Sequence, residues 1–253
     1  MSKTVLAFDV YGTLLSTESV ATRLAEHFGQ DAGKSITASW RRYQLEYTWR
    51  LNSIGKYDAF SNVTRNALTH AVAEQGLVLT QEDTSEIMDA YDHLSTFHEV
   101  CTALDKLATH GKLKPVIFSN GTPDMLTKAV SSLRQCFQSV CLQSGDLEPH
   151  EEIFEEIISV DSVKKFKPAP EVYEYLAERV GKDKNDKAQM GDIWLISGNP
   201  FDVTGALSVG LKAAWVDRAG KGWIDAMNPQ LRPTLVGKDL NEVIDAIIDK
   251  AGR

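Results

Sequence analysis

Apolar residues form short, uninterrupted runs at four places along the chain. Each run has four residues and lacks the alternation with polar residues that is typical of a strand with one solvent-exposed face. Such runs are typical of strands in a parallel sheet, which are buried on both faces. They lie at residues 5–8, 115–118, 193–196 and 213–216.

Segments between these runs have the spacing of amphipathic helices, with apolar residues three and four positions apart. The spacing predicts helices at 99–109, 124–133, 170–180 and 202–209. The last of them is followed by Gly210, a residue that often ends helices. The alternation of strands and helices predicts an α/β fold with a doubly wound parallel sheet.

Residues 17–95 interrupt this alternation. They have helical patterns and no apolar run of strand quality, and they include Trp40, Trp49 and Phe60. We interpret them as a helical cap domain inserted after the first strand. The core domain would then consist of residues 1–16 and 96–253.

Composition and charge narrow the range of partners. The 253 residues include 27 Lys and Arg against 35 Asp and Glu, for a net charge of −8, which argues against nucleic acid as the main partner. The apolar run before Asp9 is too short for a signal peptide or a membrane span. We therefore expect a soluble, cytoplasmic protein with no membrane partner.

The three cysteines, Cys101, Cys136 and Cys141, form no CxxC pair, and free thiols are expected.

Polar side chains follow three of the predicted strands directly. They are Asp9, Ser119, Asn120, Ser197, Asn199 and Asp202. Because ligands of open parallel sheets bind at the carboxyl ends of the strands, these residues are candidates for one site. Thr122 and Pro123 resemble a helix start, and the free N–H groups of that helix would favour an anionic substrate.

Four motifs in order, "FDVYGTL", "FSNG", "KKFKP" and "SGNPFD", resemble those of the haloacid dehalogenase superfamily. The segment "SWRRYQLEYTW" at residues 39–49 is similar to the L-2-haloacid dehalogenase branch. The resemblance covers most of residues 5–218 and implies a Rossmann-like core with a nucleophilic aspartate. It is weaker at residues 143–157, which we interpret as a solvated acidic insertion, and after residue 220.

The resemblance implies hydrolysis of short L-2-haloacids to D-2-hydroxy acids through an aspartyl ester. Asp9 would attack C2, Thr13 would hydrogen-bond its carboxylate, and Lys167 would keep it ionised. Asp202 would orient or activate water, with Ser197 and Asn199 as hydrogen-bonding partners. The substrate carboxylate would lie at Ser119 and at backbone amides around Tyr11 and Asn120. Arg41 would receive the halide or hold the carboxylate. The apolar wall of the substrate site would be formed by Tyr11, Leu45, Phe60 and Phe201.

Two other readings stay open. A phosphatase of this superfamily has a second acid two residues after its nucleophile and an acid early in the fourth motif that helps to bind magnesium. Here those positions are Tyr11 and Gly198, so we expect no metal and no cofactor. A non-catalytic binding protein on the same scaffold is the third possibility. The set of Asp9, Lys167, Asn199 and Asp202 argues against it. The resemblance also implies a homodimer that pairs through the cap helices.

Overall fold

The computed structural model describes residues 3–108, 110–144 and 153–251. Its centre is a six-stranded, all-parallel sheet in the order β3-β2-β1-β4-β5-β6. The strands are β1 (Thr4–Phe8), β2 (Leu113–Ser119), β3 (Glu156–Ser159), β4 (Ile193–Ser197), β5 (Lys212–Val216) and β6 (Leu235–Gly237). Both the predicted α/β class and the parallel sheet are confirmed.

The four predicted strands are the four at the middle of the sheet. β1 pairs with β2 on one side and β4 on the other, so that Phe8 lies opposite both Ile117 and Ile196. Four of the five β1 residues are buried, and so is every residue of β4. Burial on both faces explains why these strands are unbroken apolar runs in the sequence.

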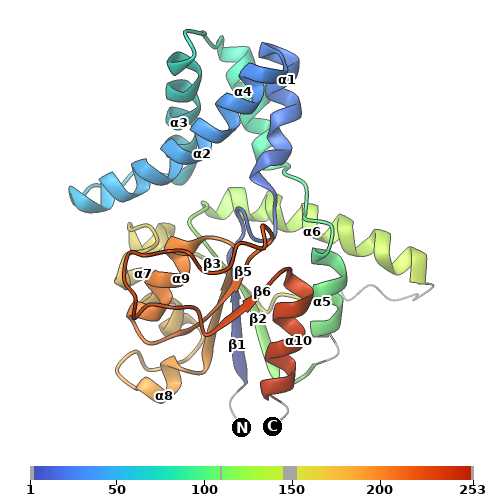
Figure 1. The fold of residues 1–253 in the computed structure, drawn as a ribbon, viewed down its shortest axis with the longest axis vertical. Helices are drawn as coiled ribbons and strands as arrows, with labels where there is room; N and C mark the ends of the chain where they lie inside the picture. Colours follow the sequence, from blue (N-terminus) through green and yellow to red (C-terminus); the bar gives the residue numbers. More distant parts are fainter. Residues whose placement is uncertain (1–2, 109, 145–152, 252–253) are drawn as a thin grey trace.

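Helices cover both faces of this sheet (Figure 1). On one side lie α5 (Val100–Ala108), α6 (Pro123–Ser144) and α10 (Leu240–Ala251), and on the other lie α7 (Pro170–Arg179), α8 (Lys187–Met190) and α9 (Pro200–Ser208). A short helix, η2 (Val160–Val163), follows β3. None of the described helices combines the length and hydropathy that a membrane crossing requires.

A separate group of helices stands at the carboxyl end of the strands (Figure 1). This group, called the cap helices or the cap below, consists of η1 (Thr17–Val20), α1 (Ala21–Phe28), α2 (Gln30–Ser53), α3 (Phe60–Glu74) and α4 (Gln81–Asp92). The two connections to the sheet run side by side, because Leu15 forms a bridge with Thr96 and the Ser16 N–H donates to the Ser95 carbonyl oxygen.

Some expectations about elements were wrong. The edge strands β3 and β6 were missed, and α6 continues to Ser144, well beyond the predicted end at residue 133. The predicted acidic insertion at 143–157 therefore begins in α6 and ends in β3, while its residues 145–152 lie outside the described part. β3 was hidden because only one of its four residues is fully buried, which leaves no apolar run.

The expectation of free thiols was also wrong for one cysteine. Cys101, on α5, is disulfide-bonded. The side chains of Cys136 and Cys141 lie outside the described part of the chain.

Candidate active site

Asp9 directly follows β1, where the chain turns away from the sheet. The turn passes through Gly12, whose φ of 84° is in the left-handed region that favours glycine. This turn places Thr13 beside the carboxylate, and the Thr13 Oγ1 donates to Asp9 Oδ2 at 2.8 Å. The same hydroxyl accepts from the Gly198 N–H at 2.9 Å, which ties the turn to the end of β4.

The two oxygens of the Asp9 carboxylate have different surroundings. Oδ2 also accepts from Asn199 Nδ2 at 2.7 Å and from Ser197 Oγ at a longer 3.4 Å. Oδ1 accepts from the Lys167 ammonium at 3.2 Å. Among the described residues, three donors thus contact Oδ2 and one contacts Oδ1. Asp9 is 6% exposed, so the residue is buried but not entirely closed to solvent.

Lys167 is buried between two carboxylates. Its Nζ lies 3.2 Å from Asp9 Oδ1 and 2.8 Å from Asp202 Oδ2, and it also donates to the Phe118 carbonyl oxygen at 2.8 Å. The side chain is 1% exposed. A single buried ammonium therefore balances part of the charge of two buried acids.

Asp202 is fully buried in the first turn of α9. Burial raises the pKa of its carboxyl, and Asp9 acts in the same direction, whereas the Lys167 charge opposes the shift. The Tyr173 hydroxyl donates to Asp202 Oδ1 at 2.7 Å. Burial, followed by the Asp202 charge, holds the pKa of Tyr173 well above its ordinary value, so this donor keeps its proton. Sequence reasoning missed Tyr173, whose only signal was its place in a predicted helix.

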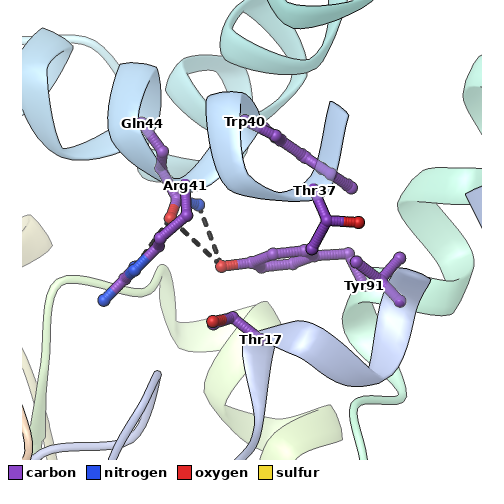
Figure 2. Close-up of a pocket in the computed structure, with 7 residues that line it drawn as sticks. Thr17, Thr37, Trp40, Arg41, Gln44 and Tyr91 are labelled. Atoms are coloured by element: carbon purple, nitrogen blue, oxygen red, sulfur yellow. Dashed lines mark hydrogen bonds between the residues drawn. The ribbon is translucent and has the colours of Figure 1, made fainter. Parts of the chain in front are cut away.

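Arg41 extends from α2 in the cap toward the sheet. Its Nη2 donates to the Tyr11 carbonyl oxygen and to Asn199 Oδ1, each at 3.1 Å. Its Nη1 donates to Gln44 Oε1 at 2.8 Å. Figure 2 shows Gln44 between Arg41 and the Tyr91 hydroxyl, to which the Gln44 amide donates at 3.0 Å. The guanidinium is thus oriented before any substrate binds.

The residues around Arg41 also line a small cavity in the cap (Figure 2). Gln44 and Tyr91 were not predicted. Gln44 is fully buried and lies one helical turn from Arg41, and this spacing could have identified it.

The second strand supplies two predicted residues with different surroundings. Ser119 is fully buried, and its hydroxyl accepts from the Gly121 N–H at 3.2 Å. Asn120 Oδ1 accepts from the Lys167 N–H at 3.0 Å. The Asn120 side chain therefore holds the lysine loop, a use that sequence reasoning did not foresee. Its backbone N–H remains a candidate for binding substrate.

Aromatic side chains of the core and the cap meet around Asp9. Tyr11 is buried, with its ring 5.7 Å from Phe60 and 5.6 Å from Tyr91 between centroids. Phe201 is half-buried and packs edge-on against Trp49 of the cap at 5.6 Å. Leu45 is half-buried on α2, and its place in the apolar wall stays a prediction.

Comparison with known proteins identifies the family to which this arrangement belongs. The model of the haloacid dehalogenase-like hydrolases matches residues 3–210. The chain belongs to the haloacid dehalogenase-like hydrolases. It is 35% identical to an (S)-2-haloacid dehalogenase of Pseudomonas sp. (strain YL), over 85% of this chain and 83% of the relative.

A second relative and a solved structure widen the comparison. The chain is 33% identical to haloacetate dehalogenase H-2 of Moraxella sp. (strain B), over 85% of this chain and 86% of that one. The structure of the L-2-haloacid dehalogenase from Xanthobacter autotrophicus with chloropropionic acid covalently bound has a TM-score of 0.78. It is 28% identical and matches 98% of this chain and 99% of its own.

The haloacid dehalogenase-like site of this chain has no room for an acid at Gly198. A Cβ built there would lie 2.5 Å from the Gly12 carbonyl oxygen, closer than such atoms approach. Burial raises the pKa of Tyr11 well above its ordinary value, so the phenol stays neutral. Neither position can therefore supply the charged oxygen that a hard cation prefers.

Arg218 connects the turn after Asp9 to the second connection between the cap helices and the sheet, and sequence reasoning missed it. Its guanidinium donates to the Thr13 carbonyl oxygen at 2.8 Å and pairs with the buried Glu99 carboxylate at 2.6 Å. It also lies 3.6 Å above the Phe97 ring. Arg218 comes two residues after β5, so a search for polar residues beyond every strand end could have found it.

Proposed function

We propose that the protein is a metal-independent hydrolase that converts short L-2-haloacids to D-2-hydroxy acids. The observation that carries this proposal is the Asp9 carboxylate, held by Lys167 with a neutral Tyr11 in place of the phosphatase acid. The names of the relatives agree with it, because they are (S)-2-haloacid and haloacetate dehalogenases.

In the first step, Asp9 Oδ1 attacks C2 of the substrate from the side opposite the halogen. A carbon–oxygen bond forms, the carbon–halogen bond breaks, and its electron pair leaves with the halide. Oδ1 suits this role because Oδ2 already accepts from Thr13 and Asn199 at short distances. Rear attack inverts C2, so an L-haloacid yields a D-hydroxy acid.

In the second step, water attacks the ester carbonyl carbon of Asp9. Asp202 accepts the proton of the water, and its raised pKa makes it a better base than an ordinary aspartate. The bond between that carbon and the former Oδ1 breaks, and the oxygen takes back the proton held by Asp202 and leaves with the product as its hydroxyl. The remaining proton of the water is lost to solvent when the Asp9 carboxylate forms again. Lys167, which donates to both carboxylates, stabilises the negative charge that develops between them.

Substrate binding uses groups on both domains. The Ser119 hydroxyl and the backbone N–H groups at the start of α6 form the site for the substrate carboxylate. Arg41 contributes a cation from the cap that receives the departing halide or steadies that carboxylate. Tyr11, Phe60 and Phe201 form the wall against the C2 substituent.

The test compares two products in one experiment. Halide release from L-2-chloropropionate is measured beside phosphate release from p-nitrophenyl phosphate with magnesium. We expect halide only, at a rate that EDTA does not change, and no turnover by a folded Asp9→Asn variant. Phosphate release that needs magnesium would contradict the proposal, and so would halide release by Asp9→Asn.

Oxygen labelling tests the ester intermediate. With enzyme in excess and one turnover in water enriched in heavy oxygen, the product should carry almost no label, because its new oxygen comes from Asp9. The peptide that contains Asp9 should become heavier. Labelled product from the first turnover would instead mean direct displacement by water.

We also propose the division into a core of residues 1–16 and 96–253 and a cap of 17–95, a cytoplasmic location, and a homodimer. Two apolar side chains on the cap support pairing of subunits, since Trp49 is 41% and Ile54 67% exposed. Sedimentation at micromolar concentration should give twice the 28.0 kDa chain mass. A monomeric mass would refute the dimer.

A further inference from the structure

Asn52, at the end of α2 in the cap, is bonded twice to the backbone of one core residue. Its Nδ2 donates to the Phe166 carbonyl oxygen at 2.7 Å, and its Oδ1 accepts from the Phe166 N–H at 3.0 Å. The two residues are 114 positions apart in the chain. Phe166 directly precedes Lys167, the lysine that bridges the two carboxylates of the site.

The cap also encloses the Phe166 side chain. Phe166 is fully buried, and its ring stacks on Tyr57 at 5.0 Å and packs against Phe60 at 6.1 Å between centroids. A backbone N–H at this position has no access to water, so Asn52 satisfies a group that is costly to leave unpaired. This contact can form only when the cap is docked on the core.

The bonds on Phe166 bear on the site through the next residue. The Lys167 N–H donates to Asn120 Oδ1 at 3.0 Å, so this short stretch is held by the cap at residue 166 and by the core at residue 167. The Lys167 side chain then spans the distance to Asp9 and Asp202. A backbone shift at Phe166 would move the ammonium relative to both acids.

We propose that Asn52 is a positioning residue that couples the docked cap to the placement of Lys167. With the cap docked, Asn52 holds the backbone at Phe166, and the ammonium lies between Asp9 and Asp202. With the cap displaced, this hold is lost and the acids lose part of their counter-charge. The catalytic consequence rests on the proposed dehalogenase function, whereas the mechanical coupling does not.

The mechanical coupling is tested without activity, by hydrogen exchange of the segment around residues 166 and 167. Asn52→Ala removes both bonds, and amide exchange there should rise about tenfold or more. Asn62→Ala is the matched control, because Asn62 lies in the cap and is exposed, and its side chain bonds only Asp58 among the contacts described. Equal exchange in the two variants would overturn the proposal.

The catalytic consequence is tested by kinetics with L-2-chloropropionate. Asn52→Ala should lower kcat about tenfold while KM stays within about threefold, because Ser119 and Arg41 are untouched. The acid limb of kcat should move to higher pH, because a displaced Lys167 raises the pKa of Asp202 further. A merely structural loss would lower kcat without moving this limb, and that result would overturn the catalytic part.

A second variant at the same position keeps the test informative if Asn52→Ala does not fold. Asn52→Leu has a similar size but neither donor nor acceptor, so it also removes both bonds and should show the same changes in exchange and acid limb. If the wild-type protein releases no halide while exchange still rises in both Asn52 variants, the proposed function fails and the coupling stands. If halide is released and neither variant changes kcat, the coupling has no part in catalysis.

Discussion

Replacing Lys167 with methionine removes the only charge between Asp9 and Asp202 in the described contacts and keeps most of the side-chain length. The lysine side chain is 1% exposed, that of Asp202 0% and that of Asp9 8%. Breaking a buried ion pair by removing one partner costs about 3–5 kcal/mol, because the remaining charge stays desolvated. This is a large part of the roughly 5–15 kcal/mol that separates a folded domain from its unfolded chain.

The loss should depend on pH with a definite sign. Burial already raises the pKa of Asp202 and the lysine opposes that shift, so its removal raises the pKa further above the unfolded value. A carboxyl group with a raised folded pKa favours the folded state at low pH and loses that contribution as pH rises. The deficit of Lys167→Met should therefore be larger at about pH 8 than at about pH 5.

Urea unfolding followed by tryptophan fluorescence measures this deficit at both pH values. Lys165→Met is the matched control, because this half-buried lysine lies two residues away, outside the site, and should change stability by less than about 0.5 kcal/mol. Halide release should be lost in Lys167→Met and kept in Lys165→Met. Equal unfolding midpoints for the two variants, or a deficit that does not grow with pH, would refute the reasoning about buried charge.

Three further predictions follow from particular contacts. Gln44→Leu should raise KM more than it lowers kcat and should cost about 1–3 kcal/mol of stability, because the Arg41 guanidinium loses its partner. An unchanged KM would count against this prediction. Gly198→Ala should lower the free energy of unfolding, measured in urea, by about 1–3 kcal/mol, because the new Cβ would lie 2.5 Å from the Gly12 carbonyl oxygen. Gly111 has open space around it, so Gly111→Ala should leave the free energy of unfolding unchanged. The acid limb of kcat should lie above the ordinary aspartate value of about 3.9, because burial raises the pKa of Asp202; a limb at or below that value would exclude it as the base.

The sequence by itself determined the centre of the sheet and the chemistry at its edge. Strands buried on both faces must be apolar throughout, so the four central strands appear as unbroken apolar runs. Because parallel strands end at the same edge, residues that follow them, such as Asp9, Ser197 and Asn199, could be expected to meet. They do meet, although Asp9 and Asn199 are 190 positions apart.

Only the tertiary structure decided which side chains hold these residues in place. Edge strands β3 and β6 are short and half-buried, so burial imposes no apolar run on them. Nothing periodic links Asn52 to Phe166, Gln44 to Tyr91, or Tyr173 to Asp202. Such pairs depend on how the cap sits on the core and on how helices pack against the sheet. A sequence pattern predicts which side of a helix or strand is buried. Which side chain of another segment contacts that side depends on how segments distant in the sequence pack together.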